Sequence, residues 1–311
     1  MALAVLFPGQ GSQFRGMGAD LFDRRPDLLG SIADEILGWS LRRMCLEAED
    51  EELTRTEYAQ PALYAVSYAL WAEMAEKLSM APVAAAGHSL GEYTALAAAG
   101  ALDYEQGLAL VAERGRAMTG AADHEPSGMA AVIGTDLEAT ESAALARRQM
   151  GGRLFVANIN APGQIVVAGG AEDLDWLEAE MPNLGIKRVI RLNVAGAFHS
   201  PFMEAAADRL AAALAGVEIG PSRFPTWSNV TAEPHQPEHI KDHLVRQVIS
   251  PVRFADTLQA IAAAGADVFL HVGPGDVTAG LAKRSAPGLR YLVVSDHAGI
   301  PPVIEALGTI D

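Results

Sequence analysis

A serine between two glycines stands at residues 87–91, in the stretch GHSLG, where a short apolar run gives way to an alanine-rich one. This pattern is typical of a nucleophile elbow, a sharp strand-to-helix turn that pushes the Oγ atom of Ser89 into a cleft. Small flanking residues allow such a turn to form. The other interpretation is a glycine-rich turn in which the serine caps a helix. Ser89 is therefore a candidate nucleophile that needs support from the rest of the chain.

A base for this serine is available at His199, in the stretch NVAGAFHSPFM. The pattern puts it in a loop between a strand and a helix start, where a side chain can face a cleft. Acyl transfer through a serine also needs an oxyanion hole. The main-chain N–H groups of Leu90 and of Gln10, in the loop FPGQGSQ, suit that purpose. No acidic residue between Ser89 and His199 follows a predicted core strand, so we expect a dyad whose histidine is oriented by a neutral group.

The elements that must position these residues follow an α/β pattern. Strands are predicted at 3–7, 83–87, 267–273 and 289–294, and helices at 89–99, 104–118, 254–264 and from Pro201, with Ser200 as N-cap. Residues 129–193 predict the order strand, helix, strand, strand, helix, strand, which is the ferredoxin-like signature. We therefore expect a small subdomain over 126–195, inserted into a larger α/β unit formed by 1–125 and 196–311.

Composition narrows the classes of partner. Half of the 311 residues are hydrophobic and the net charge is −16. This charge argues against nucleic acid as a partner, because phosphate binding needs a basic surface. No apolar run approaches the roughly 18 residues of a membrane span, and the first residues lack the features of a signal peptide. The single cysteine, Cys45, fits a reducing cytoplasm and is expected in the core.

Three histidines, His235, His239 and His243, are spaced four residues apart and could share one face of a helix. They lie among polar and charged residues, so we expect a solvated helix start and not a metal site. No CxxC, HExxH or other ligand spacing indicates a metal. We expect neither a metal nor another cofactor.

Nine stretches resemble those of a known family. In chain order they are FPGQGSQFRGMG, YAQPALYAVSYALW, GHSLGEYTALAAAG, LVAERGRAM, GMAAVIG, NINAPGQIVVAGG, VAGAFHSPFM, RQVISPVRF and VGPGDVTAGLAKR. Together they resemble the malonyl-CoA:acyl carrier protein transacylases and the acyltransferase domains of polyketide synthases, over essentially the whole chain. GHSLG alone is unspecific, whereas the ordered set is highly specific. The resemblance implies an α/β fold with an α/β-hydrolase-like core and an inserted ferredoxin-like (βαββαβ) subdomain.

The resemblance also implies catalytic roles for residues that match the family motifs. Ser89 would be the nucleophile and His199 the general base. Gln10 and Leu90 would form the oxyanion hole. The main-chain carbonyl of Gln247, in RQVISPV, would orient the histidine, and this would account for the absence of an acidic partner.

Four further positions match residues that contact the substrate in the family. Gln60 and Asn160 would line the pocket, and Arg114 would pair with the malonyl carboxylate. Phe198 would crowd the α-carbon and so exclude methylmalonyl groups. Taken without the resemblance, Arg114 could be a solvated helix arginine and Phe198 a core residue.

The implied activity is ping-pong transfer of a malonyl group from malonyl-CoA to the phosphopantetheine thiol of an acyl carrier protein. The stretch ADEILGWSLRRMCLEAEDEELTRTEYAQPALYAV and SNVTA (228–232) look most like discrete acyltransferases that serve modular polyketide synthases in trans. A housekeeping transacylase of fatty-acid synthesis is the alternative. Two other classes stay open: an editing acyl hydrolase on the same fold, which Arg114 disfavours, and a non-catalytic carrier-docking module, which Ser89 and His199 disfavour.

Overall fold

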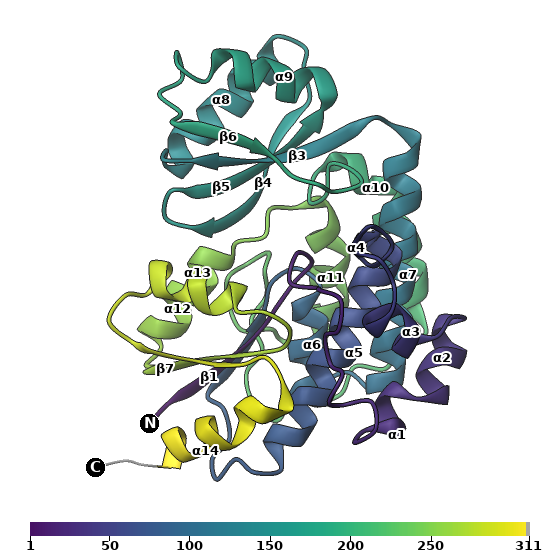
Figure 1. Ribbon diagram of the computed structural model, residues 1–311. Coiled ribbons are helices and arrows are strands. Elements are labelled where there is room, and N and C mark those ends of the chain that lie inside the picture. The colour runs from purple at the N-terminus through teal and green to yellow at the C-terminus, as the bar shows by residue number, and fades with distance from the viewer. Residues whose placement is uncertain (309–311) are drawn as a thin grey trace.

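The computed structural model describes residues 1–308 and has an α/β fold with two sheets (Figure 1). The larger part contains a parallel sheet in the order β2-β1-β7-β8. Its strands are β1 (Leu3–Phe7), β2 (Ala84–Gly87), β7 (Val268–Val272) and β8 (Arg290–Val294). Every residue of β1, β2 and β7 is buried, which explains why they read as continuous apolar runs. The four predicted strands are confirmed.

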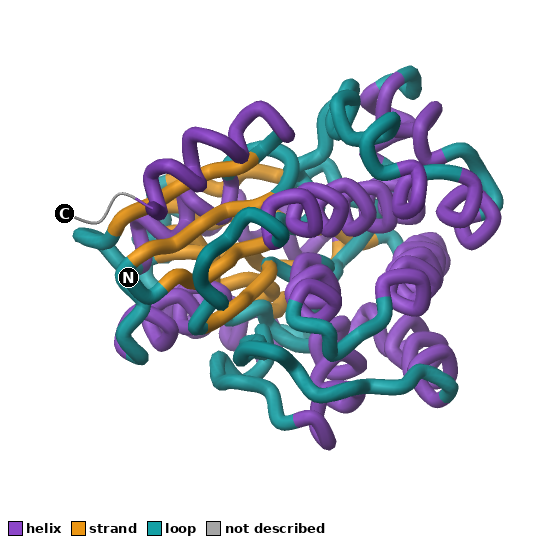
Figure 2. Tube along the Cα trace, turned by 90° about the horizontal axis from the view of Figure 1, so that it is seen from below, coloured by secondary structure: helices purple, strands orange, loops and turns teal. Residues whose placement is uncertain are grey.

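Helices lie on both sides of these strands (Figure 2). The long ones are α5 (Thr56–Ala75), α6 (Gly91–Ala98), α7 (Tyr104–His124), α10 (Glu204–Ala215), α11 (Ile240–Ile249), α12 (Phe254–Ala263), α13 (Val277–Ser285) and α14 (Ile300–Gly308). Four short helices precede α5: α1 (Pro26–Leu29), α2 (Ser31–Leu37), α3 (Leu41–Leu46) and α4 (Asp50–Thr54). Among residues 1–308, no helix combines the length and apolar character that crossing a bilayer requires.

Two helix starts illustrate how local sequence sets these bounds. Asp103 caps α7, because its carboxylate accepts hydrogen bonds from the N–H groups of Glu105 and Gln106. Ser200 takes the predicted N-cap position before Pro201, but its side chain makes no capping hydrogen bond. Its hydroxyl donates to the carbonyl of Ala197 at 2.5 Å instead. A 3-10 turn, η1 (Pro201–Met203), therefore follows it, and α10 begins only at Glu204.

The second sheet is antiparallel, in the order β4-β5-β3-β6, and lies at the top of Figure 1 with α8 and α9 beyond it. The elements follow the predicted order: β3 (Ser127–Ile133), α8 (Leu137–Gln149), β4 (Leu154–Ala161), β5 (Gln164–Gly170), α9 (Ala171–Glu180) and β6 (Arg188–Arg191).

Strand β4 joins the two parts of the molecule. The main chain of Val252, just before α12, bonds to Ala157 and Ile159 of β4 at 2.9 and 2.8 Å. The pairing of β4 with β5 is irregular between Val156 and Asn158, and again after Ile159. These contacts fix the segment that carries Asn158 and Asn160 against the larger part.

Candidate active site

The turn from β2 to α6 is as tight as the serine motif predicts. Ser89 has a φ of 52°, a left-handed conformation uncommon for a residue with a side chain. A Cβ atom on Gly87 would lie 1.9 Å from the main chain of Gly91, and one on Gly91 would lie 2.5 Å from the carbonyl oxygen of Phe7. Both glycines are therefore required by the close approach of β1, β2 and α6, and together they hold Ser89 at the apex of the turn.

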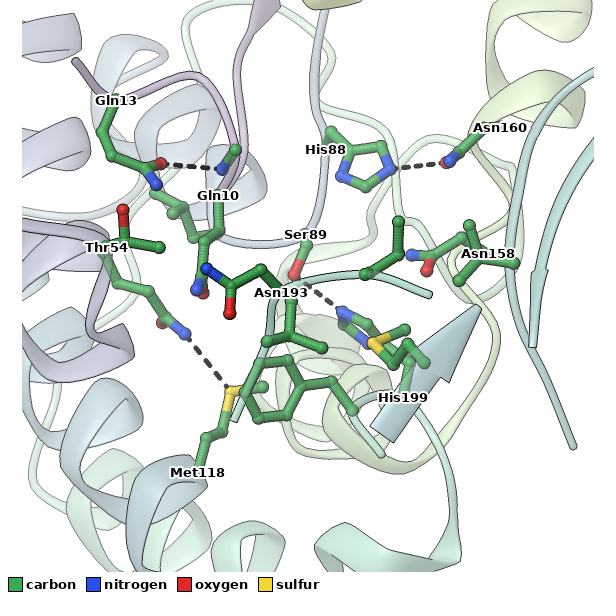
Figure 3. A pocket seen from close by; sticks show the side chains of 18 of the residues that line it. Gln10, Gln13, Thr54, His88, Ser89, Met118, Asn158, Asn160, Asn193 and His199 are labelled. Carbon is green, nitrogen blue, oxygen red and sulfur yellow. Dashed lines mark hydrogen bonds between the residues drawn. The ribbon is translucent and has the colours of Figure 1, made fainter. Parts of the chain in front are cut away.

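Ser89 and His199 lie in contact although 110 residues separate them (Figure 3). The Oγ atom of Ser89 is 2.8 Å from Nε2 of His199, and Nδ1 of His199 is 2.7 Å from the main-chain oxygen of Gln247. A carbonyl only accepts hydrogen bonds, so Nδ1 carries the proton and Nε2 is left to accept the serine hydroxyl.

The electrostatics favour a neutral His199. Burial, and after it the positive charge of Arg114, lowers the pKa of His199 to about 3, against the effect of the Gln247 carbonyl. The imidazole is therefore unprotonated at neutral pH. A neutral, correctly oriented imidazole beside a hydroxyl can act as a general base.

Arg114, on α7, is buried directly beside this pair, with only 1% of its surface exposed. Nη2 donates to the Oγ atom of Ser89 and to Oε1 of Gln247, both at 2.9 Å. Nη1 donates to Oε1 of Gln60 at 2.6 Å. Burial lowers the pKa of Arg114, but a guanidinium stays charged in proteins. The site therefore holds a desolvated cation within reach of anything attached to Ser89.

Eight of the nine predicted site residues line one cavity of about 310 Å³, and Gln247 lies behind its wall, bonded to Arg114. Phe198 forms part of the wall and is 5% exposed. Asn160 is held by Nε2 of His88, 2.7 Å from its Oδ1 (Figure 3). Gln10 and Leu90 line the cavity together with Ser89. The structure thus brings all nine predicted residues together.

Several residues of the site escaped the sequence analysis. Asn158 lines the cavity near Asn160 (Figure 3), and the alternation in NINAPG was a signal for it, since residues two apart share a face of a strand. Glu92, Asn229 and His235 lie beneath the serine and had no local signal.

The burial of His235 differs from the sequence-based expectation, whereas that of Cys45 agrees with it. The expectation that His235 is solvated is wrong, because its side chain is 1% exposed and its Nε2 is 2.7 Å from Oε1 of Glu92. Cys45 is in the core as expected, and burial raises the pKa of its thiol to about 12. Within residues 1–308, no group of three or more His, Cys, Asp or Glu side chains is arranged to hold a metal ion.

The family of the chain follows from its similarity to known proteins. Residues 5–285 match the family model described as acyl transferase domain. The chain belongs to this acyltransferase family. The acyltransferase is 39% identical to the malonyl CoA-acyl carrier protein transacylase of Bacillus subtilis, over 98% of this chain and 97% of that one. It is 42% identical, over 91% of its length, to a polyketide biosynthesis protein, ThaF, of Burkholderia thailandensis, of which it spans only 24%.

The fold of the acyltransferase also matches solved structures. One is a type II polyketide synthase acyl carrier protein in complex with its malonyl transacylase, with a TM-score of 0.93 and 38% identity, covering 98% of this chain and 100% of that one. Another is an acyl carrier protein S-malonyltransferase of Vibrio cholerae, with a TM-score of 0.91 and 37% identity, covering 97% and 100%.

Proposed function

We propose that this acyltransferase moves a malonyl group from malonyl-CoA to the phosphopantetheine thiol of an acyl carrier protein. The observation that carries the proposal is the buried guanidinium of Arg114, 2.9 Å from the Oγ atom of Ser89. An acyl group that bears a second carboxylate can pair with this cation, whereas a neutral acyl group leaves a buried charge without an anion. The names of the relatives from Bacillus subtilis and Vibrio cholerae support the proposal.

The reaction runs in two half-reactions through an ester on Ser89. In the first, the Oγ atom attacks the thioester carbonyl of malonyl-CoA while its proton passes to Nε2 of His199. The carbon–sulfur bond breaks, and His199 returns the proton to the sulfur of CoA. In the second, the carrier thiol gives its proton to His199 and its sulfur attacks the ester. The oxygen–carbon bond then breaks and Ser89 regains the proton. The carbonyl of Gln247, 2.7 Å from Nδ1, holds the imidazole in the orientation that both steps need.

The negative oxygen of each tetrahedral intermediate needs donors fixed in advance. We assign this role to the main-chain N–H groups of Gln10 and Leu90, both on the cavity wall beside Ser89. Leu90 immediately precedes α6, so its N–H lies at the positive end of the helix dipole.

Arg114 has donors to spare for the substrate. Of the five N–H groups of a guanidinium, one bonds to Gln60, one to Gln247 and one to the hydroxyl of Ser89. Acylation converts that hydroxyl into an ester oxygen, a weaker acceptor, and this leaves the N–H free to donate to the malonyl carboxylate. The two amide oxygens keep the guanidinium plane in place. Phe198 narrows the cavity and disfavours an α-methyl group.

Two biosynthetic pathways, polyketide and fatty-acid synthesis, use malonyl groups delivered in this way. We propose that the enzyme serves a polyketide synthase in trans, supported by its 42% identity to a region of ThaF. The alternative is a housekeeping transacylase of fatty-acid synthesis, supported by the match to the Bacillus subtilis protein along almost its whole length. Deletion of the gene distinguishes them, because loss of a polyketide with normal growth favours the first and lethality favours the second.

We also propose the finer division of the fold. Residues 1–125 and 196–311, of which 309–311 lie outside the described residues, form an α/β-hydrolase-like catalytic subdomain, and 126–195 form a ferredoxin-like subdomain. The strand order β4-β5-β3-β6 with two helices supports the second assignment, and the serine turn after β2 supports the first. The expectation of a cytoplasmic location, which rests on the single cysteine, stays a prediction.

The test is incubation with radiolabelled malonyl-CoA, with and without a phosphopantetheinylated carrier protein. Label should appear on the enzyme alone and then move to the carrier. Mass spectrometry should locate one malonyl adduct on the peptide that contains Ser89, and Ser89→Ala should abolish both labelling and transfer. An adduct elsewhere, for example on Cys45, would refute the assignment. Release of free malonate without a carrier, as fast as transfer with one, would favour the editing hydrolase.

A further inference from the structure

A buried carboxylate close to Ser89 takes no part in the acyl-transfer steps. Glu92, in the first turn of α6, is 0% exposed. Its Oε2 atom accepts hydrogen bonds from the main-chain N–H of Asn229 at 3.0 Å and from Nε2 of Gln247 at 2.6 Å. Its Oε1 atom is 2.7 Å from Nε2 of His235. A buried carboxylate is costly unless it is satisfied in this way, and the groups that these contacts hold in place indicate its role.

Both residues that contact Oε2 hold the main chain of Ser89. Oδ1 of Asn229 accepts the N–H of Ser89 at 2.7 Å, and Nε2 of Gln247 donates to the carbonyl oxygen of Ser89 at 3.0 Å. A residue in a left-handed conformation persists only where its surroundings over-determine it. The carboxylate of Glu92 thus secures the main chain of Asn229 and the side-chain amide of Gln247, and both residues support the strained serine.

The same carboxylate, together with the carbonyl oxygen of Ser89, sets the orientation of the Gln247 amide. An ionised carboxylate only accepts hydrogen bonds, so the nitrogen of the amide must face Glu92 and the oxygen must face away. That oxygen accepts from Nη2 of Arg114 at 2.9 Å. A reversed amide would set an NH2 group against the guanidinium, donor against donor. The unbroken chain from Glu92 through Gln247 to Arg114 also joins two buried opposite charges.

We propose that Glu92 is a positioning residue for substrate choice. Through Oε2 it holds the amide of Gln247 in the orientation that fixes Arg114, and it thereby sets the preference for an acyl group with a carboxylate. This inference rests on the proposed function. A positioning role changes the ratio of kcat/KM for malonyl-CoA to that for acetyl-CoA. A merely structural role would lower both values together.

The test compares Glu92→Asp with Glu92→Gln, measuring kcat/KM for self-acylation by malonyl-CoA and by acetyl-CoA. Aspartate keeps the charge but is one methylene too short to reach Gln247, so the malonyl-to-acetyl ratio should fall about tenfold or more, the worth of one hydrogen bond to a charged group. Glutamine keeps the reach and an acceptor oxygen, so it should retain most of the ratio. Glu113→Asp is the matched control. This residue precedes Arg114 on α7 but pairs with the exposed Arg209, and the ratio should not change.

Three results would overturn the inference. The first is a Glu92→Asp variant that keeps the wild-type ratio, which would assign any loss in Glu92→Gln to charge. The second is a Glu92→Gln variant that loses the ratio as fully as Glu92→Asp, because its acceptor oxygen still reaches Gln247. If Glu92→Asp fails to fold, Gln247→Met replaces it, because methionine removes the amide between Glu92 and Arg114 and keeps the main-chain carbonyl. The third result that would overturn the inference is an unchanged malonyl-to-acetyl ratio in Gln247→Met. A wild-type enzyme without malonyl preference would refute the proposed function, and this inference with it.

Discussion

Replacing Arg114 with alanine should lower the preference for malonyl-CoA over acetyl-CoA. Ser89 should still be acylated by the neutral substrate. The guanidinium is 1% exposed, so its pairing with a malonyl carboxylate is scarcely screened by water. Removing one partner of a buried ion pair costs about 3–5 kcal/mol, which corresponds to roughly 10²–10⁴-fold in kcat/KM. Self-acylation by acetyl-CoA, which places no charge near Arg114, should be reduced far less or improve.

The assay is rapid quenching of self-acylation with labelled malonyl-CoA and acetyl-CoA, with the melting temperature of each variant as a check on folding. Arg114→Lys is the matched control. It keeps the charge but lacks the planar fork that bonds to Gln60 and Gln247, so its malonyl preference should be intermediate. An equal loss for both substrates in Arg114→Ala would refute the reasoning, as would a wild-type preference for a neutral acyl group.

Three further predictions concern the base, the cavity wall and the turn. Because burial and Arg114 lower the pKa of His199 to about 3, its neutral form persists until the pH falls through that value. kcat/KM for self-acylation should therefore stay level down to pH 5, where a histidine of ordinary pKa would lose about 30-fold; a fall beginning near pH 6.5 would contradict this. Phe198→Ser should relax the exclusion of methylmalonyl-CoA, measured as its kcat/KM relative to malonyl-CoA, and an unchanged ratio would remove Phe198 from substrate choice. Gly87→Ala should abolish acylation and lower the melting temperature sharply, since its Cβ would lie 1.9 Å from Gly91, whereas Gly216→Ala, with no atom within 4 Å of the new Cβ, should leave both nearly unchanged.

The sequence by itself determined the strands of the core and the turn that carries Ser89. Continuous apolar runs such as residues 3–7 can only be satisfied by burial on both faces, and GxSxG has a local steric meaning, because Gly87 and Gly91 admit no Cβ. Such patterns can be recognised in the sequence because each depends on residues that are close together in the chain. The loop pattern also made His199 a candidate base, and the resemblance to the transacylases supplied the remaining candidates, Gln247 and Arg114 among them.

Only the tertiary structure decided how these residues depend on one another. Glu92 reads as an ordinary charge in the first turn of a helix, and His235 as one of three solvated histidines. They meet because the segment after α10 returns beneath α6 and brings Asn229, His235 and Gln247 within hydrogen-bond distance of one carboxylate. The contact of Gln247 with Glu92 spans 155 residues. No periodicity or spacing encodes such a meeting, since it depends on chain segments that are adjacent only after folding.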